Sequence, residues 1–330
     1  DSTAQKEAFA DTWTNVSYMD MLNELSDLDI SLYNFLKSLD NTNISKGAIS
    51  YLTTMAIRLW YMHRLLKPTG SFYLHCDATM SHYLKILCDL IFGESNFKNE
   101  IIWQRTNAHN LKTPSFGRVH DIILFYSKSN NVVWNIIYEE YSKEQLSRFK
   151  KDQNGRLYKA ENLTMSSANS SRQFEWRGTK PPSNRSWGYS LEKLEELWNS
   201  GMILAKHDGS PRQDGLKVYL DDLPGKTLND VWIDIQRIGN TSNERLGYPT
   251  QKPEALMERI IQASSNDGDL VADFFCGCGT TIAAAEKLKR KWLGVDISHL
   301  AVRLIGRRLI DSNGDEIEKT FEIHGFPKDI

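Results

Sequence analysis

The feature that most constrains the fold is a glycine loop near the end of the 330-residue chain. The run LVADFF is followed by CGCG and then by TTIAAAEKLKR, which predicts a strand, a tight loop and a helix. A second strand, KWLGVDIS, and a second helix, HLAVRLIGRRLI, come next. Strands joined in this way by helices build parallel sheets with right-handed crossovers, so the sequence predicts an α/β fold.

Acidic residues mark the ends of both predicted strands. Asp273 precedes Gly277 and Gly279, and Asp296 follows Asp273 by twenty-three residues. Glycines let the backbone turn tightly and approach a ligand closely, and a carboxylate at the second strand end can accept hydrogen bonds from two ribose hydroxyls. We expect a ribose-bearing cofactor here, because acidic residues have no packing purpose at strand ends. The alternative is a glycine turn that only packs the helix on the strand.

The loop also separates two classes of cofactor. The nicotinamide fingerprint has a third glycine, where this chain has Ile282, and it places a pyrophosphate at the helix N-terminus. An acidic residue at the start of the loop instead suits a cofactor with a cationic end and no phosphate. S-adenosylmethionine has an ammonium, a sulfonium and no phosphate, so it is the predicted cofactor. A nicotinamide-dependent dehydrogenase is the rival enzyme.

Composition excludes several other classes of protein. Apolar residues make up 40% and charged residues 25%, the usual globular mixture. The four cysteines are too few for a disulfide framework, and Cys276 and Cys278 have no second Cys or His pair nearby for zinc. We therefore expect a cytoplasmic protein without a metal. No apolar run reaches the ~18 residues of a membrane helix, and a net charge of −2 neither demands nor excludes nucleic acid.

Helices and strands also alternate in the first part of the chain. Apolar residues at helical spacing predict a helix over 45–66 with Ser45 as N-cap, followed by a strand over 71–77. A further helix ending at Gly93 and the strands NEIIWQR and HDIILFYS follow.

The character of the chain changes near residue 130. Residues 141–227 are polar, and they carry fifteen Lys and Arg against eleven Asp and Glu, a local net charge of +4. This pattern predicts an inserted, mostly irregular lobe with one helix. The α/β alternation returns after residue 228 with a helix that has Pro253 in its first turn.

The segment GYPTQKPEALMERII, directly before the glycine loop, resembles the cofactor half of DNA amino-methyltransferases. The order of the halves resembles the β class, and residues 50–312 look like type III modification subunits. The resemblance implies a doubly wound, mixed, mostly parallel α/β sheet of the class I methyltransferase type. It implies a catalytic half at 1–129, an inserted target-recognition lobe at 130–228 and an S-adenosylmethionine-binding half at 229–330. The residues that it assigns to the cofactor are Thr250, Lys252, Pro253, Asp273, Phe275, Gly277, Gly279, Thr280 and Asp296.

The family's catalytic tetrad, Asp, Asn or Ser followed by Pro-Pro and an aromatic residue, has no match in this chain. The only Pro-Pro is Pro181-Pro182, and its neighbours Lys180 and Ser183 can neither accept protons from a base amine nor stack on the base. In the family order the tetrad precedes the segment FADTW, so we expect it upstream of Asp1 and expect this chain alone to be inactive. The alternative is that this member has lost the tetrad and is a non-catalytic DNA-binding or cofactor-binding module.

The resemblance implies methyl transfer to the exocyclic amine of a base flipped out of double-stranded DNA. Adenine N6 is preferred over cytosine N4, and the expected setting is a restriction-modification system with a restriction subunit and a homodimer as possible partners. No membrane partner is expected.

Two groups of residues are candidates for DNA contact. Trp103, Arg105 and Asn107 follow a predicted strand and could reach the flipped base or its phosphates; the alternative is a packed Trp and a solvated Arg. In the lobe, basic residues are interleaved with aromatic ones, a pattern that suits DNA; the alternative is a solvated face. His75 is expected to be a buried strand residue. The basic residues of the lobe are Arg172, Arg177, Lys180 and Arg185.

Overall fold

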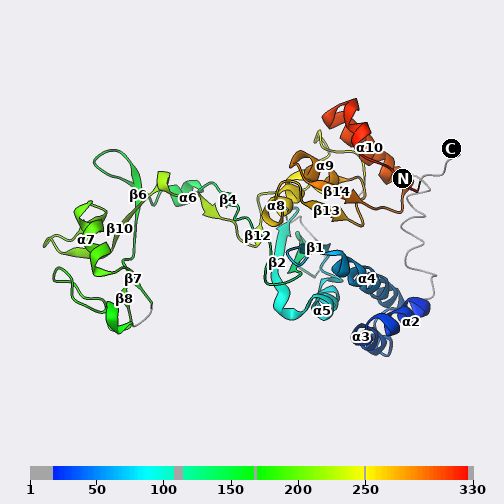
Figure 1. The fold of residues 1–330 in the computed structure, drawn as a ribbon, viewed down its shortest axis with the longest axis horizontal. Coiled ribbons are helices and arrows are strands. Elements are labelled where there is room, and N and C mark those ends of the chain that lie inside the picture. The colour runs from blue at the N-terminus through cyan, green and yellow to red at the C-terminus, as the bar shows by residue number, and fades with distance from the viewer. Residues whose placement is uncertain (1–17, 108–113, 167–168, 249, 326–330) are drawn as a thin grey trace. The chain divides into compact units, whose positions relative to one another are not determined.

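The computed structural model describes residues 18–107, 114–166, 169–248 and 250–325, and the segment FADTW lies outside them. The chain forms two compact units (Figure 1). Unit 1 comprises Asp1–Ile137 and Asn229–Ile330, and unit 2 comprises Tyr138–Leu228. The catalytic, target-recognition and cofactor-binding roles expected for three segments remain proposals.

Four helices of unit 1 precede or flank its first strand. Their apolar faces meet in one core, where Leu25, Leu52 and Leu84 are fully buried. Ser45 caps the longest of them, because its hydroxyl oxygen accepts a hydrogen bond from the Ala48 amide at 3.2 Å, so the predicted N-cap is confirmed. The helices are α2 (Tyr18–Leu28), α3 (Ile30–Asp40), α4 (Lys46–Leu65) and α5 (Ser81–Phe92).

The larger sheet of unit 1 has the strand order β1-β3-β2-β12. Its second strand, β3, is antiparallel to both neighbours, so β1 and β2 point the same way. Cys76 pairs with Ile122 and Gln104 pairs with His120, which puts the carboxyl ends of β1 and β2 at the edge where β3 begins. The strands are β1 (Ser71–Cys76), β2 (Phe97–Gln104), β3 (His120–Ser127) and β12 (Val231–Trp232); the short turn η1 (Glu94–Asn96) precedes β2.

A separate parallel pair, β13 (Leu270–Asp273) and β14 (Lys291–Gly294), carries the glycine loop. One face of this pair packs on helices α8, α9 and α10 (Figure 1), while Leu270 and Leu293 on the pair and Val295 just after it are exposed. The predicted succession of strand, helix, strand and helix is confirmed. The helices are α8 (Glu254–Ser264), α9 (Thr280–Lys287) and α10 (His299–Asn313), and the short helix η4 (Asp315–Thr320) follows.

The α/β class with mixed sheets is therefore confirmed. Among the described strands of unit 1, two pairings are parallel and two are antiparallel, so the antiparallel share is larger than expected. The reason lies in the connection after β2, which contains no described helix between Gln104 and His120. A parallel crossover normally needs such a helix, whereas an antiparallel return does not.

The end of α8 joins the two sheets of unit 1. The Tyr73 hydroxyl on β1 lies 2.5 Å from the Ser264 hydroxyl. The Asn135 backbone amide donates to the Ala263 carbonyl at 2.7 Å, and its side chain donates to the Ser265 carbonyl at 2.9 Å. These contacts fix α8, and therefore the segment that leads into it, against β1.

Unit 2 is more regular than its sequence suggests. Its main sheet is antiparallel in the order β5-β6-β10-β9, which the sequence did not predict. The predicted helix is confirmed as α7, and a second helix of four residues, α6, was missed. A register shift between Pro211 and Leu216 breaks the alternation of β10, which hides that strand from pattern analysis. The elements are β4 (Tyr138–Glu139), α6 (Lys143–Leu146), β5 (Lys150–Lys151), β6 (Leu157–Glu161), β7 (Thr164–Met165), η2 (Ser170–Arg172), β8 (Ser186–Trp187), α7 (Leu191–Asn199), β9 (Ile203–Ala205), β10 (Pro211–Tyr219), η3 (Leu220–Asp222) and β11 (Lys226–Thr227).

None of the helices in the described part of the chain is both long enough and apolar enough to cross a bilayer.

Candidate functional site

Both glycines of the loop after β13 are required by its geometry. Gly277 has φ +51° and Gly279 has φ +75°, values that side chains disfavour. A Cβ atom on Gly279 would lie 2.5 Å from Ile305 Cγ1 on α10, and one on Gly277 would lie 3.1 Å from the Tyr248 ring. The glycines therefore allow the loop to turn and allow α10 and Tyr248 to approach it.

The two strand-end carboxylates hold this loop in place. Asp273 accepts hydrogen bonds from the Phe275 amide at 3.0 Å and the Thr281 hydroxyl at 2.6 Å. Asp296 accepts from the Gly277 amide at 2.9 Å and the Ser298 amide at 2.8 Å. We expected no packing purpose for these acidic residues at the strand ends, but they serve the fold as well, because loop amides need acceptors. Each carboxylate oxygen has a second lone pair, so both groups can still accept a hydrogen bond from a ligand.

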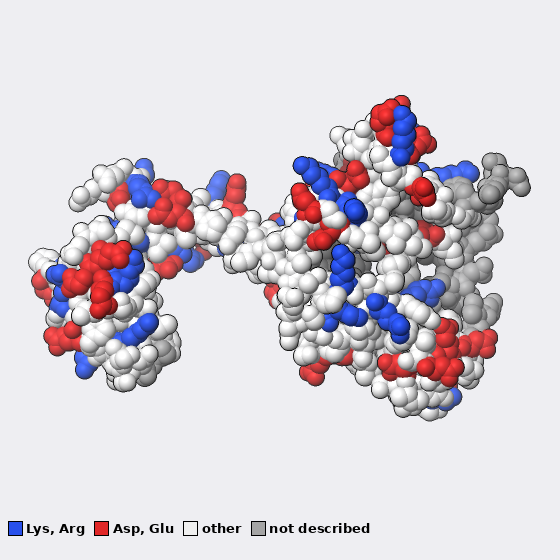
Figure 2. Space-filling view, in the orientation of Figure 1, with Lys and Arg blue, Asp and Glu red and all other residues white. Residues whose placement is uncertain are grey.

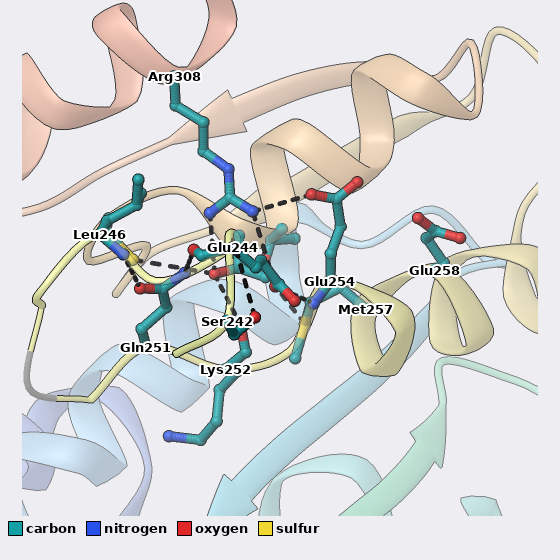
Figure 3. Close-up of polar contacts among 12 residues, drawn as sticks. Ser242, Glu244, Leu246, Gln251, Lys252, Glu254, Met257, Glu258 and Arg308 are labelled. Atoms are coloured by element: carbon teal, nitrogen blue, oxygen red, sulfur yellow. Dashed lines mark hydrogen bonds and ion pairs between the residues drawn. The ribbon is translucent and has the colours of Figure 1, made fainter. Parts of the chain in front are cut away.

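A buried arginine joins the glycine loop to the segment before α8. The Arg308 side chain is 8% exposed and donates to Glu254 at 2.9 Å (Figure 3). It also donates to the Thr280 hydroxyl at 3.3 Å. The Thr280 hydroxyl in turn donates to the Lys252 carbonyl at 3.2 Å. Helix α10, the first residue of α9 and the TQKP segment are thereby held as one network.

The segment before α8 is also folded on itself. Glu244 accepts from the Glu254 amide at 2.6 Å, which satisfies the first amide of α8, and its side chain lies 4.0 Å from Arg308. Gln251 donates to the Glu244 carbonyl at 2.6 Å and accepts from the Leu246 amide at 2.8 Å (Figure 3). These contacts give the TQKP segment a defined shape before any ligand arrives.

Lys252 places an unusual ammonium in this segment. Its Nζ donates to the Thr250 carbonyl at 3.0 Å, and it forms no ion pair with any described residue. Burial lowers the pKa of Lys252, and attraction to Asp121 offsets part of that effect. A partly buried ammonium without a carboxylate partner favours an anionic ligand. Pro253 is buried at the N-cap of α8, and Thr250 is exposed.

Apolar side chains flank both carboxylates. Phe275, two residues after Asp273, is 52% exposed, and Ile297, next to Asp296, is 80% exposed. Exposed apolar groups beside carboxylates suit a ligand with both an apolar ring and hydroxyl groups. Cys276 is buried in contrast, and burial together with the nearby Asp273 and Asp296 charges raises the pKa of its thiol to about 12.

Sequence reasoning missed four residues of this site: Tyr248, Glu244, Ile297 and Arg308. Tyr248 lies against the loop, where burial and the Asp296 charge raise the pKa of its hydroxyl to about 12. Tyr248 and Ile297 are direct neighbours of the two motifs, so attention to the apolar residues beside each motif could have found them. Arg308 and Glu254 are 54 residues apart, and no spacing rule predicts their contact.

Of the DNA-contact candidates of unit 1, one is buried and two are accessible to solvent. Trp103 is 2% exposed and its indole N–H donates to the Ile235 carbonyl at 2.7 Å, so its assignment to base contact is corrected in favour of the packed alternative. Arg105 is partly exposed at the end of β2, and Asn107 is exposed and accepts from Gln104 at 3.3 Å. His75 is partly exposed rather than buried, because it leaves the core to bond with Asp121.

The candidates in unit 2 are mostly engaged within the unit. Arg177 pairs with Glu195 at 2.7 Å, Arg185 donates to Thr164 at 2.8 Å, and Arg172 donates to the Gly188 carbonyl at 3.1 Å. Trp176 and Trp187 lie in the core, so these aromatics are unavailable to a base. On the viewed face of unit 2, basic side chains are mixed with acidic ones (Figure 2).

Lys180 differs from these arginines. Its side chain is exposed, and only its backbone carbonyl, which accepts from Gln213 at 2.6 Å, is hydrogen-bonded to the described part of unit 2. Contact between unit 2 and DNA thus stays a prediction, and Lys180 is the candidate best placed for it.

Comparison with known proteins identifies the class that this fold and site define. The family model described as DNA methylase, of the N6/N4 type, matches residues 31–307, and the chain belongs to that family. The Type II methyltransferase M.EcaI of Enterobacter cloacae is 36% identical over 261 residues, which are 78% of this chain and 57% of that protein. The Type III restriction-modification enzyme StyLTI Mod subunit of Salmonella typhimurium is 25% identical over 257 residues, 73% of this chain and 39% of that protein.

A further similarity is local. The DNA adenine methyltransferase YhdJ of Escherichia coli is 45% identical over 84 residues, which are 26% of this chain and 28% of that protein. The chain spans about half the length of these and similar curated relatives that it matches over most of its own length.

Gly279→Ala tests the packing of the loop against α10. We expect this change to lower the free energy of unfolding by ~1–3 kcal/mol more than Gly314→Ala does, because an added Cβ would overpack Ile305. Gly314 has a similar positive φ of +83°, but a Cβ added there would meet nothing within 4 Å, so it isolates the backbone cost. Urea unfolding measures the loss of free energy of unfolding in both variants. Equal losses in the two variants would contradict the packing argument.

Proposed function

We propose that this chain binds S-adenosylmethionine in unit 1 and forms the cofactor half of a DNA amino-methyltransferase. One observation carries the proposal: Asp296, at the carboxyl end of the second parallel strand, is fixed beside a glycine loop and retains lone pairs for a ribose. Exposed apolar side chains lie next to the two strand-end carboxylates in sequence, and the TQKP segment, which carries the Lys252 ammonium, is hydrogen-bonded to the start of α9. No pyrophosphate site of the nicotinamide type accompanies Asp296, because Ile282 occupies the third glycine position.

Each part of the cofactor would then have a matching group. Asp296 would accept from the two ribose hydroxyls, and Phe275 and Ile297 would pack on the adenine ring. Lys252 would neutralise the methionine carboxylate, and Asp273 at the other side of the loop would attract the ammonium. Thr280, Gly277 and Gly279 have small side chains or none, so they would shape the loop that positions these groups.

The residues of this chain would act mainly by orientation. When bound, S-adenosylmethionine supplies an electrophilic methyl group. The amine of a base is a poor nucleophile, so its lone pair must be aligned with the methyl carbon at ~3–3.5 Å. The network of Arg308, Glu254 and Thr280 would keep the cofactor-binding segments rigid during that alignment. The groups that accept the amine protons are expected in the Pro-Pro-aromatic tetrad, which this chain does not contain.

The substrate and partners of the whole protein belong to the same proposal. The preference for adenine N6 over cytosine N4 is supported by the relative named a DNA adenine methyltransferase. A restriction-modification setting, with double-stranded DNA and a restriction subunit as partners, is supported by the name of the type III relative, a restriction-modification Mod subunit. A homodimer is proposed from the sequence resemblance alone. Such a system would place the protein in the cytoplasm.

A non-catalytic binding module is the second candidate. A chain that keeps the cofactor site but lacks the tetrad would bind the cofactor or DNA without transferring a methyl group. This non-catalytic module shares the cofactor site with the first proposal and differs from it in the chemistry.

Cofactor binding is tested by thermal unfolding. S-adenosylmethionine at about 100-fold above its Kd should stabilise the chain by ~2.7 kcal/mol, and NADH should not. Asp296→Ala should abolish the effect, because the ribose loses its acceptor. Thr281→Val, which removes a hydrogen bond to Asp273 but no carboxylate, should keep most of it and thereby control for a loosened loop. Stabilisation by NADH alone, or unchanged stabilisation in Asp296→Ala, would sink the proposal.

Methyl transfer separates the two candidate functions. A longer protein that contains this chain and an upstream tetrad should transfer tritiated methyl groups from S-adenosylmethionine to duplex DNA, with N6-methyladenine as the product. Residues 1–330 alone should transfer none, because the amine protons find no acceptor. A parent protein without a tetrad and without transfer would favour the non-catalytic module.

A further inference from the structure

A second polar cluster lies at the carboxyl ends of β1 and β2, outside the glycine loop. Asp121, at the start of β3, accepts a hydrogen bond from Arg105 Nε at 2.9 Å on one carboxylate oxygen. Its other oxygen lies 3.0 Å from His75 Nε2. Strands β1 and β3 and the residue that directly follows β2 therefore form a single cluster.

Asp121 serves the protein itself rather than a ligand. Its side chain is 13% exposed, and each oxygen already has a partner. Burial alone would raise the pKa of Asp121, but the hydrogen bond from His75 and the charges of His75, Arg105 and Lys252 lower it. The carboxylate is thus kept ionised in a fixed position, where it can orient a cation.

Arg105 is the group that remains available. Its side chain is 38% exposed, and Nε alone of its guanidinium is bonded among the described residues, so Nη1 and Nη2 can donate outward. The charge of Lys252 lowers the pKa of Asp121, the charge of Arg105 lowers the pKa of Lys252, and Lys252 lacks an ion pair within the described chain. Arg105 pairs with Asp121, and Lys252 adds a second positive charge nearby, so two cations share the surroundings of one carboxylate.

We propose that Asp121 orients Arg105 to bind a backbone phosphate of the strand that carries the target base. The inference rests on the proposed function, since it needs a nucleic-acid substrate at the edge that holds the cofactor. A guanidinium held through Nε presents its remaining N–H groups as a planar fork, and a phosphate matches that fork. Phosphate contacts set the position of DNA on a protein, so this contact would bring the base to the cofactor side of unit 1. Asp121 is then a positioning residue.

The role of Asp121 gives a prediction whose sign opposes simple electrostatics. Asp121→Asn removes a negative charge, so charge alone would strengthen binding to DNA. If Asp121 orients Arg105, the same change should weaken binding several-fold, because the guanidinium loses its fixed position. Asp311→Asn is the matched control: Asp311 forms an exposed pair with Arg307, and its loss should leave binding unchanged or slightly stronger.

Fluorescence anisotropy with a duplex oligonucleotide, over a range of salt concentrations, measures these effects on the full chain. Arg105→Gln should weaken binding on the order of tenfold and reduce the slope of log K against log salt by about 1. Arg307→Gln removes the same charge elsewhere and is the control. Arg105→Lys keeps the charge, so its slope of log K against log salt should lie between those of Arg105→Gln and the unsubstituted chain. The affinity for S-adenosylmethionine should be unchanged in the Asp311 and Arg307 variants, and it should change less than the affinity for DNA in the Asp121 and Arg105 variants, whose charges act on Lys252.

Three results would overturn the inference. Asp121→Asn could leave DNA binding unchanged or stronger, as expected for the control Asp311→Asn. The unsubstituted chain could also fail to bind DNA. Arg105→Gln could weaken S-adenosylmethionine while leaving DNA binding intact, which would assign Arg105 to the cofactor carboxylate. Cofactor stabilisation of the unsubstituted chain is measured separately, so failure here is distinct from failure of the proposed function. If Asp121→Asn does not fold, the Arg105 variants alone test whether Arg105 binds a phosphate of DNA.

Discussion

The hydrogen bonds that Asp273 and Asp296 accept from the glycine loop are the interactions on which the site depends. Loop amides at the end of a strand have no partner in the sheet, and a hydrogen bond to a charged acceptor contributes ~1.5–3 kcal/mol, less where solvent reaches it. The two carboxylates satisfy these donors and stay partly open to solvent. The same groups that shape the loop are therefore the groups that a ribose-bearing cofactor would meet.

The buried Arg308 extends this arrangement to the rest of unit 1. It joins α10 to the start of α9 and, through Thr280, to the carbonyl of Lys252. A buried guanidinium is costly unless charged and hydrogen-bonded partners surround it, and here Glu254 and Glu244 supply the charge. The contacts of α8 with β1 then connect the cofactor side to the edge where Arg105 and Asp121 lie.

The sequence predicted features formed by residues that are close together in the chain, and it did not predict contacts between distant segments. The strand, glycine loop and helix around Asp273 follow from periodicity and glycine placement, and Ser45 follows from capping rules. Contacts such as Arg308 with Glu254, or Asp121 with His75 and Arg105, join distant segments and leave no local signal. In unit 2, the basic and aromatic pattern predicts a DNA surface, although burial of Trp176 and Trp187 and the pairing of Arg177 show that much of it builds the unit. Alternation along one sequence cannot separate a buried aromatic from an exposed one.

The most direct test of the central claim is a crystal structure of the chain grown with S-adenosylmethionine. We predict that both ribose hydroxyls lie within hydrogen-bonding distance, ~2.5–3.0 Å, of the Asp296 carboxylate. The adenine ring should lie between Phe275 and Ile297, with the loop hydrogen bonds to Gly277 and Ser298 retained. A cofactor bound elsewhere, or a loop that must release Asp296 before the ribose can bind, would contradict the claim that one carboxylate serves both the fold and the ligand.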